Sequence, residues 1–351
     1  DRYFSTERIL SFLVISGGIV KWYTANQVDY QSWLLLSILY SVLYMPTLAL
    51  SNSITFSHIS DQENDFPKIR VWGTLGWIAA SWAFPMIWLQ TDLQFQMMPP
   101  FFVGTEVPQV TSRLADALKF SGIISICYGV FCFSLPHTPP KKDAVDQLAF
   151  KKAFGLFRYS SFAVLVLASL AISIIHQIYF LQTGPFLSSI GILDSQIGPA
   201  MTIGQFAEIL TMAYLGYFLK NIGFKKVITI GIAAYCFRYA IFGSESLPVW
   251  IIVLSQAFHG FCYAFFFAAA YIYVDKIADE DVRHSAQTVF GIIILGGGPV
   301  IGGWLSGFLQ SANTVNNVFN FSTFWYTLSL IGLITTVLFF MFFKEELAER
   351  E

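Results

Sequence analysis

Ten long apolar runs constrain the fold of this 351-residue chain more than any other feature. The hydrocarbon core of a bilayer is about 30 Å thick, and an α-helix of roughly 20 apolar residues crosses it. The runs cover residues 6–23, 31–55, 69–90, 113–134, 159–188, 197–219, 225–243, 248–274, 283–309 and 321–343. Only 12% of the residues are charged, against about 25% in a soluble domain. The sequence therefore predicts an all-α membrane protein, with helix breaks expected at Pro46, Pro85, Pro185 and Pro299.

The positions of lysine and arginine predict how these helices are oriented. If the N-terminus is cytoplasmic and the runs alternate, the external segments hold two of these residues, Lys21 and Arg113, and the cytoplasmic segments hold 16. The cytoplasmic set is Arg2, Arg8, Lys68, Arg70, Lys141, Lys142, Lys151, Lys152, Arg158, Lys220, Lys225, Lys226, Lys276, Arg283, Lys344 and Arg350. Because cytoplasmic loops are rich in Lys and Arg, both ends of the chain are expected in the cytoplasm.

A basic loop at residues 135–158 divides the first four runs from the last six. Its Pro-Pro-Lys-Lys stretch cannot continue a helix. We therefore expect an incomplete N-terminal bundle at residues 1–134, a cytoplasmic linker at 135–158 and a C-terminal bundle of six helices at 159–351. Transporters built from repeats have matching halves. The four-plus-six division, in a chain that opens without Met, thus predicts that two helices precede this sequence.

The composition disfavours several other classes of function. A net charge of −2 argues against nucleic-acid binding, which needs a basic face. The sequence contains neither a GxSxG nor an HExxH motif, and its four cysteines lie inside apolar runs without metal-ligand spacing. The glycines of residues 296–307 lack the lysine of a phosphate cradle, so close helix packing is expected there. We predict no enzyme activity, no cofactor and no metal site.

Glu208 is the clearest polar candidate inside a predicted helix. A charged group at mid-membrane costs about 2.5–3.5 kcal/mol on insertion scales, which makes it a functional candidate by default. Gln205 lies three residues earlier on the same helix face, so the two side chains could offer a carboxylate and an amide to one cavity. Glu208 could then exchange a proton or accept hydrogen bonds from a solute. The alternative is a structural hydrogen bond to a neighbouring helix.

Two other predicted helices carry polar residues at depth. Gln256, His259 and Tyr263 are spaced i, i+3, i+7 and share one helix face. His259 could titrate near neutral pH, and Tyr263 could stack on a base or sugar. His176 and Gln177 are adjacent, so at most one of them can face the same cavity.

A further group of polar residues includes candidates for gating. Arg238 lies within two turns of the external end of its run and is expected to extend outward to the membrane interface. Asn52, towards the cytoplasmic end of its run, could belong to a gate or make a simple helix contact. Asp275 and Arg283 lie in a charged cytoplasmic cluster, which could pair to hold one conformation closed or could be an ordinary solvated loop.

Arg70, Thr74 and Trp77 form a stripe on the third predicted helix. Residues i, i+4 and i+7 share one face, so a guanidinium, a hydroxyl and an indole could together recognise a planar, hydrogen-bonding solute. The alternative is that Arg70 anchors the helix end at the lipid headgroups.

The stretches YMPTLALSNSI (residues 44–54) and DFPKIRVWGTLGW (65–77) resemble the nucleoside:proton symporter family of the major facilitator superfamily. GQFAE (204–208), HGFCYAFFF (259–267) and RHSAQ (283–287) follow in the same order, so the resemblance spans nearly the whole chain. It implies a major-facilitator helical bundle of twelve membrane helices, of which ten are present here. It also implies the bacterial cytoplasmic (inner) membrane as location, and nucleosides and protons as partners.

The resemblance implies roles for particular residues. The positions that match nucleoside-contacting or polar and aromatic lining positions are Arg70, Thr74, Trp77, Gln177, Gln205, Glu208, His259 and Tyr263. Family members carry an Asp directly after the residue that matches Tyr263, whereas this chain has Ala264. Phe180 also replaces a polar residue expected nearby.

The sequence thus predicts a secondary transporter that moves nucleosides with protons by alternating access, with Glu208 as the proton-coupling candidate. Because Ala264 takes the place of a carboxylate, the alternatives are a transporter of another polar solute such as a sugar, or an uncoupled nucleoside permease. A membrane-embedded enzyme or a solute-sensing receptor is disfavoured, since we find no nucleophile–base or metal cluster and no signalling domain in this sequence.

Overall fold

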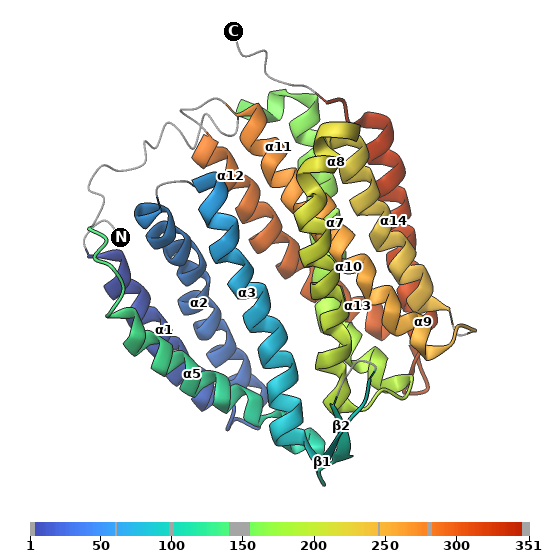
Figure 1. Ribbon diagram of the computed structural model, residues 1–351. Coiled ribbons are helices and arrows are strands. Elements are labelled where there is room, and N and C mark those ends of the chain that lie inside the picture. Colours follow the sequence, from blue (N-terminus) through green and yellow to red (C-terminus); the bar gives the residue numbers. More distant parts are fainter. Residues whose placement is uncertain are drawn as a thin grey trace. The chain divides into compact units, whose positions relative to one another are not determined.

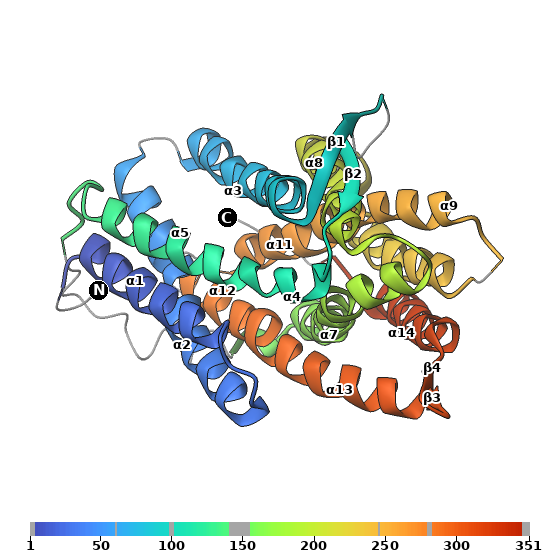
Figure 2. The same cartoon turned by 90° about the horizontal axis from the view of Figure 1, so that it is seen from below.

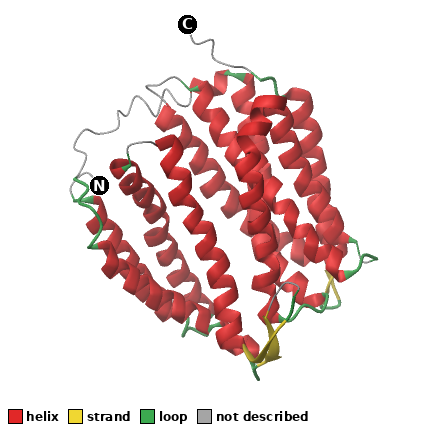
Figure 3. Ribbon diagram, in the orientation of Figure 1, coloured by secondary structure: helices red, strands yellow, loops and turns green. Residues whose placement is uncertain are grey.

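The structure of the chain is a computed structural model that describes residues 4–59, 62–97, 102–139, 155–244, 246–278 and 283–345. It forms two compact units, Asp1–Val145 and Asp146–Glu351. Helices make up most of each unit, and each unit also carries a short antiparallel two-stranded hairpin (Figure 3). The boundary between the units falls inside the range 135–158 that the sequence marks as a linker.

The described part of the first unit contains four α-helices of 17 residues or more and one short helix, α4 (Figure 1). Its elements are α1 (Thr6–Thr24), α2 (Tyr30–His58), α3 (Gln62–Phe84), the π-helical turn η1 (Pro85–Leu89), β1 (Gln90–Phe95), β2 (Phe102–Glu106), α4 (Val110–Leu114) and α5 (Asp116–Cys132). Helix α2 begins where the side chain of Asp29 accepts a hydrogen bond from the Ser32 backbone N–H at 2.9 Å, which is the usual N-cap arrangement.

Helices α1 and α5 lie side by side (Figure 2) because small residues line their contact. A Cβ added to Gly18 would lie 2.7 Å from the carbonyl oxygen of Gly122, so the two backbones approach closely only without side chains. Further along the same contact, the Ser11 hydroxyl donates a hydrogen bond to the Gly129 carbonyl at 2.6 Å.

The second unit contains the larger core. Its elements are η2 (Gly155–Arg158), α7 (Ser160–Ser189), α8 (Asp194–Gly243), α9 (Val249–Leu254), η3 (Ser255–Ala257), α10 (Phe258–Gly260), η4 (Phe261–Ala268), α11 (Ala269–Ile277), α12 (Arg283–Gly291), η5 (Ile292–Gly297), α13 (Gly298–Ala312), β3 (Thr314–Val315), β4 (Val318–Phe319) and α14 (Phe321–Phe342). Buried aromatic rings pack where α7, α8 and α14 meet; for example, Trp325 contacts Phe186, Tyr239 and Phe242.

Helix α8 reverses direction at Gly223, which divides it into two arms (Figure 1). Gly223 has φ 78° and ψ 166°. This conformation is not helical, and its positive φ is rare in residues that have a Cβ. Residues 194–222 form the first arm and residues 224–243 the second. These two arms correspond to the predicted runs 197–219 and 225–243.

Seven helical segments in the described part of the chain are long and apolar enough to cross a membrane, with both arms of α8 counted as one segment. The predicted runs 6–23 and 69–90 overlap α1 and α3, which are not among the seven. Helix α1 includes Glu7, Arg8 and Lys21, and the first half of α3 carries four charged residues.

At two of the four prolines where a break was predicted the helix changes its geometry, and at the other two it continues unchanged. Pro85 opens the π-helical turn η1, and Pro299 lies at the start of α13, directly after the π-helical η5. Pro46 and Pro185 instead lie inside the continuous helices α2 and α7. Membrane helices tolerate an internal proline when neighbouring groups compensate for the missing backbone hydrogen bond.

Candidate functional site

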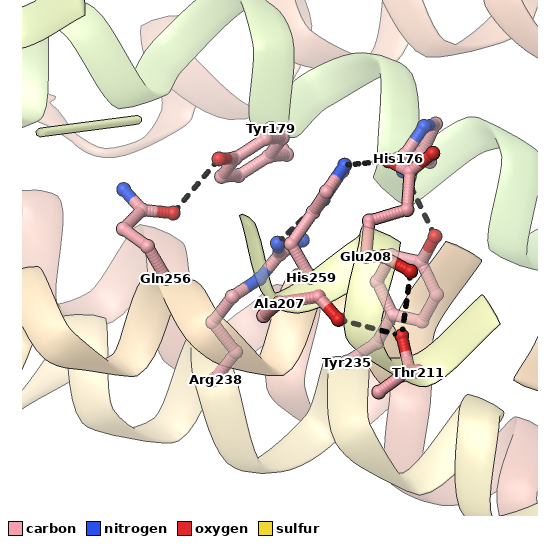
Figure 4. A network of polar contacts seen from close by, with 9 residues as sticks. All are labelled: His176, Tyr179, Ala207, Glu208, Thr211, Tyr235, Arg238, Gln256 and His259. Carbon is pink, nitrogen blue, oxygen red and sulfur yellow. Dashed lines mark hydrogen bonds and ion pairs between the residues drawn. The ribbon is translucent and has the colours of Figure 1, made fainter. Parts of the chain in front are cut away.

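A cluster of polar side chains lies in the interior of the second unit (Figure 4). It draws residues from α7, from both arms of α8, and from the helical run α9–α11. The residues are His176, Tyr179, Glu208, Tyr235, Arg238, Gln256 and His259. We call this set the Arg238 cluster.

The reversal at Gly223 explains why two charged residues far apart in sequence meet in this cluster. Glu208 lies fifteen residues before Gly223, and Arg238 lies fifteen residues after it. At 1.5 Å per residue, each is about 22 Å along its arm from the turn. Both are therefore at a similar depth.

Two glycines bring the first arm of α8 against the helix that carries His259. A Cβ at Gly204 would lie 2.9 Å from the Cβ of His259, and a Cβ at Gly260 would lie 2.5 Å from the carbonyl carbon of Ala207. The backbones therefore cross with almost no space between them. This crossing places Glu208, the residue after Ala207, next to His259.

Arg238 is enclosed by aromatic rings. Its guanidinium carbon lies 3.9 Å from the ring centre of Tyr179, 5.1 Å from that of Tyr239 and 5.4 Å from that of Tyr235. The guanidinium also donates a 3.3 Å hydrogen bond to the Tyr239 hydroxyl, which in turn donates to the Ile175 carbonyl. Cation–π contacts of this kind become stronger when the cation is removed from water.

The expectation that Arg238 extends outward to the membrane interface is wrong. The residue is completely buried. The expectation assumed that a long side chain near a helix end escapes from the low-dielectric interior. Here three tyrosines and a histidine supply an internal environment for the cation instead.

His259 lies between Arg238 and Glu208. A guanidinium nitrogen of Arg238 is 3.1 Å from His259 Nδ1, and His259 Nε2 is 3.9 Å from the carboxylate oxygen Oε2 of Glu208. Only 3% of the His259 side chain and 14% of the Glu208 side chain are exposed. The three residues therefore form a line in which an imidazole separates a cation from a carboxylate.

Other rings hold the imidazole of His259 in place. His176 stacks on it with a centroid distance of 5.6 Å and an interplanar angle of 12°, and Tyr179 stacks at the same distance and 25°. His176 Nδ1 shares a 2.8 Å hydrogen bond with the Tyr235 hydroxyl, and the Tyr179 hydroxyl donates to Gln256 at 2.8 Å. The imidazole plane of His259 is thus fixed.

Three buried polar atoms on the helices that form this line have no hydrogen-bond partner among the described residues. They are Oε1 of Gln205, Nε of Arg238 and Nε2 of Gln256. Buried polar atoms are nearly always paired with protein or with ordered water. Acceptor and donor capacity of this kind suits the recognition of a polar solute or the binding of water.

Only some of the predicted site residues of the second unit lie at the Arg238 cluster. Gln205, Glu208 and His259 lie at or next to the Arg238 cluster. Gln177 instead lies against α13, where its Cβ would be 2.9 Å from a Cβ at Gly302. Tyr263 is partly buried and contacts the Phe267 ring. Of the adjacent pair His176 and Gln177, it is therefore His176 that joins the cluster.

The predicted residues of the first unit lie on α2 and α3. Thr74 is partly buried, while Trp77 and Asn52 are exposed in this unit. The side chain of Arg70, on α3, lies outside the described residues. The role of this stripe in solute binding stays a prediction.

The two gating candidates of the second unit lie at the junction of α11 and α12. Asp275 accepts a 2.8 Å hydrogen bond from the side chain of Gln287, which joins these two helices. Arg283 opens α12, and its side chain lies outside the described residues. Asp275 thus has a structural contact within its own unit, and its part in a gate stays a prediction.

Sequence reasoning missed the tyrosines that surround Arg238. Tyr235, Arg238 and Tyr239 are spaced i, i+3 and i+4, which places them on one helix face. A cation with two tyrosines on the same helix face could have predicted a buried cation–π site. The sequence could not show the third ring, Tyr179, because it lies on a different helix, α7.

Comparisons with known proteins agree with this architecture. The family model described as "Nucleoside H+ symporter" matches residues 1–348. The protein YegT of Escherichia coli (strain K12) is 34% identical, with 98% of this chain and 80% of YegT covered. The nucleoside permease NupG of the same strain is 26% identical over 98% of this chain and 82% of its own length.

Solved structures of transporters share the fold of this chain. A crystal structure of the nucleoside transporter NupG matches with a TM-score of 0.83 and 26% identity, over 98% of this chain and 85% of that chain. A D-xylose–proton symporter matches with a TM-score of 0.71 at 10% identity, over 97% and 81%, which shows a common fold. With its apolar helices, the chain is an integral membrane protein of major-facilitator type. It belongs to the nucleoside H+ symporter family.

Proposed function

We propose that this protein transports nucleosides together with protons by alternating access, and that Glu208 carries the coupled proton. The observation that carries the proposal is a largely buried carboxylate on an apolar membrane helix, 3.9 Å from an imidazole nitrogen. A carboxylate in such a place can change its charge with small changes in its surroundings. Membership of the family, and the description of the relatives YegT and NupG as a nucleoside transporter and a nucleoside permease, support the substrate class.

Solute binding in the second unit would use the side chains that surround this carboxylate. Gln205 offers an acceptor oxygen without a described partner, and Glu208 and His259 offer groups that can accept or donate hydrogen bonds. Gln177, Tyr263 and, in the first unit, Arg70, Thr74 and Trp77 are further proposed contacts. Transporters of this type bind their solute near the membrane midplane.

The proposal includes an orientation in the bacterial inner membrane. The ten apolar ranges would each cross the bilayer, with both ends of this chain in the cytoplasm and residues 135–158 as a cytoplasmic linker between the bundles 1–134 and 159–351. The 16 to 2 distribution of Lys and Arg supports this orientation. Asn52, Asp275 and Arg283 would contribute to closure on the cytoplasmic side.

Uptake of labelled uridine by the full-length protein in vesicles tests the proposed function. Accumulation is expected when the external side is acidic, and only equilibration is expected without a proton gradient. Binding of another polar solute, with no uptake of any nucleoside, would contradict the nucleoside assignment.

A second candidate function is uncoupled permeation of a nucleoside, or transport of another solute such as a sugar. The observation that favours it is Ala264, which is completely buried in the hydrophobic core of the second unit. The resemblance to the family had implied a carboxylate at this position. A rate and extent of uridine uptake that are the same with and without a proton gradient would support the uncoupled permease.

Substitution of Arg70 with Ala is expected to weaken uridine binding by about tenfold or more, because charge-assisted hydrogen bonds are stronger than neutral ones. Isothermal titration of the purified protein would measure this change. Substitution of Lys68, two residues away on the same helix, with Ala is the matched control and should leave affinity unchanged. Unchanged affinity in Arg70→Ala would identify Arg70 as an anchor at the headgroups.

A further inference from the structure

Arg238 is a buried cation that needs a counter-charge. Removing an ion from water costs several kcal/mol unless other charges or dipoles compensate. Tyrosine rings and hydroxyls provide part of this compensation. Among the described residues, no carboxylate oxygen forms an ion pair with the guanidinium. The carboxylate of Glu208 is linked to the guanidinium only through His259, which contacts both groups.

The contact with Arg238 determines which nitrogen of His259 carries the proton. A guanidinium has only donors and does not lose its proton in proteins, so His259 Nδ1 must be the acceptor in the 3.1 Å contact. The imidazole is then neutral, with its hydrogen on Nε2. This N–H faces Glu208. A second proton on His259 would place two cations 3.1 Å apart and would break the hydrogen bond to Arg238.

The distance between His259 and Glu208 allows the Nε2–H of His259 to exchange one hydrogen-bond acceptor for another. At 3.9 Å, the Nε2–Oε2 distance exceeds that of a hydrogen bond, so a small movement of either side chain would form or break the contact. The first arm of α8 crosses the His259 helix at Gly204 and Gly260, which keeps the two groups within reach of each other.

We propose that Arg238 is the fixed counter-charge of Glu208 and acts on it through His259. This proposal rests on the proposed function, in which Glu208 carries the coupled proton. With Glu208 ionised, the line from Arg238 to Glu208 has no net charge, and the Nε2–H of His259 is attracted to the carboxylate. With Glu208 protonated, the line carries one positive charge, and the Nε2–H can donate to an oxygen of the solute instead. Arg238 is thus a positioning residue that links proton binding to solute binding.

The other titratable groups that face this line are His176, Tyr179, Tyr235, Tyr239 and Cys262. The phenols and the thiol are uncharged near neutral pH in their ordinary state. His176 stacks on His259 and shares a hydrogen bond with the Tyr235 hydroxyl. Arg238 and Glu208 are therefore the two charges on which the proposal depends.

A double-mutant cycle on thermal stability tests the charge relation without any transport assay. Arg238→Gln, Glu208→Gln and the double variant would be compared by melting temperature in detergent. If the two charges compensate each other, the double variant melts about 2–4 °C above the value expected from additivity. Asp194→Asn, at the start of the same helix, replaces Glu208→Gln in the control cycle and should show no coupling. Additive effects in the test cycle would overturn the proposal.

The protonation state of His259 can be measured even if Arg238→Gln does not fold. Nitrogen-15 NMR of the histidine-labelled wild-type protein distinguishes the two neutral tautomers from the imidazolium, and His259→Gln assigns the signal. We expect the neutral Nε2–H form throughout roughly pH 5 to pH 8, although a free imidazole titrates in that range. An imidazolium or an Nδ1–H form would contradict the proposed role of Arg238.

The pH profile of uridine uptake provides a functional readout. Without the cation, Glu208 should hold its proton more firmly, so the profile of Arg238→Gln is expected to move by about one unit to higher pH. Arg238→Lys keeps the charge and should restore the wild-type profile, and Lys220→Gln, which removes an exposed charge from the same helix, should not change it. An unmoved profile in Arg238→Gln would contradict the proposal. If the wild-type protein transports no nucleoside, the proposed function fails, while the stability cycle and the NMR measurement still test the charge relation.

Discussion

Replacement of Glu208 with Gln is expected to abolish accumulation of uridine against its gradient and to leave exchange of uridine between the two sides intact. The amide resembles the protonated carboxylic acid in size and hydrogen bonding, but it cannot release a proton. Transport by alternating access can still move solute in both directions, whereas the coupling to the proton gradient is lost. Proteoliposomes with an imposed pH gradient would measure accumulation, and counterflow of labelled uridine would measure exchange.

Asp194→Asn is the matched control for this experiment, because it neutralises a carboxylate at the end of the same helix. It should accumulate uridine as the wild type does. Unchanged accumulation in Glu208→Gln would exclude Glu208 as the coupling group. Loss of both accumulation and exchange would show that the amide fails to replace the carboxylate in solute binding.

Replacement of Gly260 with Ala is expected to disrupt both folding and transport, although the change adds a single methyl group. An ideally placed Cβ would lie 2.5 Å from the carbonyl carbon of Ala207 and 2.8 Å from the backbone nitrogen of Glu208. These neighbours are backbone atoms, so the helices must move apart. Overpacking of this kind costs about 1–3 kcal/mol, and the movement would also separate Glu208 from His259. Melting temperature and uridine uptake would be measured on the same preparation.

Gly216→Ala provides the comparison, since it makes the same chemical change on α8 at a position with open space around the added Cβ. Alanine favours the helix over glycine by about 1 kcal/mol, so this variant should be as stable as the wild type or slightly more stable. Equal behaviour of the two variants would show that the crossing at Gly260 is not tightly constrained.

The sequence was informative about which helices carry buried polar groups. Apolar runs predicted most helix bounds to within a few residues, and Glu208, Gln205 and His259 were identified because charged and polar residues are rare at membrane depth. The strands β1 (Gln90–Phe95) and β2 (Phe102–Glu106) were missed, because they lie almost entirely between the predicted runs 69–90 and 113–134, where the hydropathy pattern predicts only a connecting segment. The family assignment from short motifs was confirmed by the comparisons.

The interpretation of Arg238 was wrong because depth and surroundings depend on partners from other helices. Its position near a helix end favoured an outward path, and the three tyrosines that enclose it come from α7 and α8. The expected i, i+3, i+7 stripe of Gln256, His259 and Tyr263 was also only partly useful. The helix passes through 3₁₀, α and π geometry between these residues, which changes the angle between successive side chains.

The single-residue turn at Gly223 makes the relative positions of Glu208 and Arg238 depend on the number of residues between them. One residue inserted or deleted in either arm would rotate one of the two partners by about 100° around its helix and move it by about 1.5 Å. No loop is present at the turn to absorb such a change. A change in the length of either arm would therefore separate Glu208 from Arg238, even if every side chain of the cluster were kept.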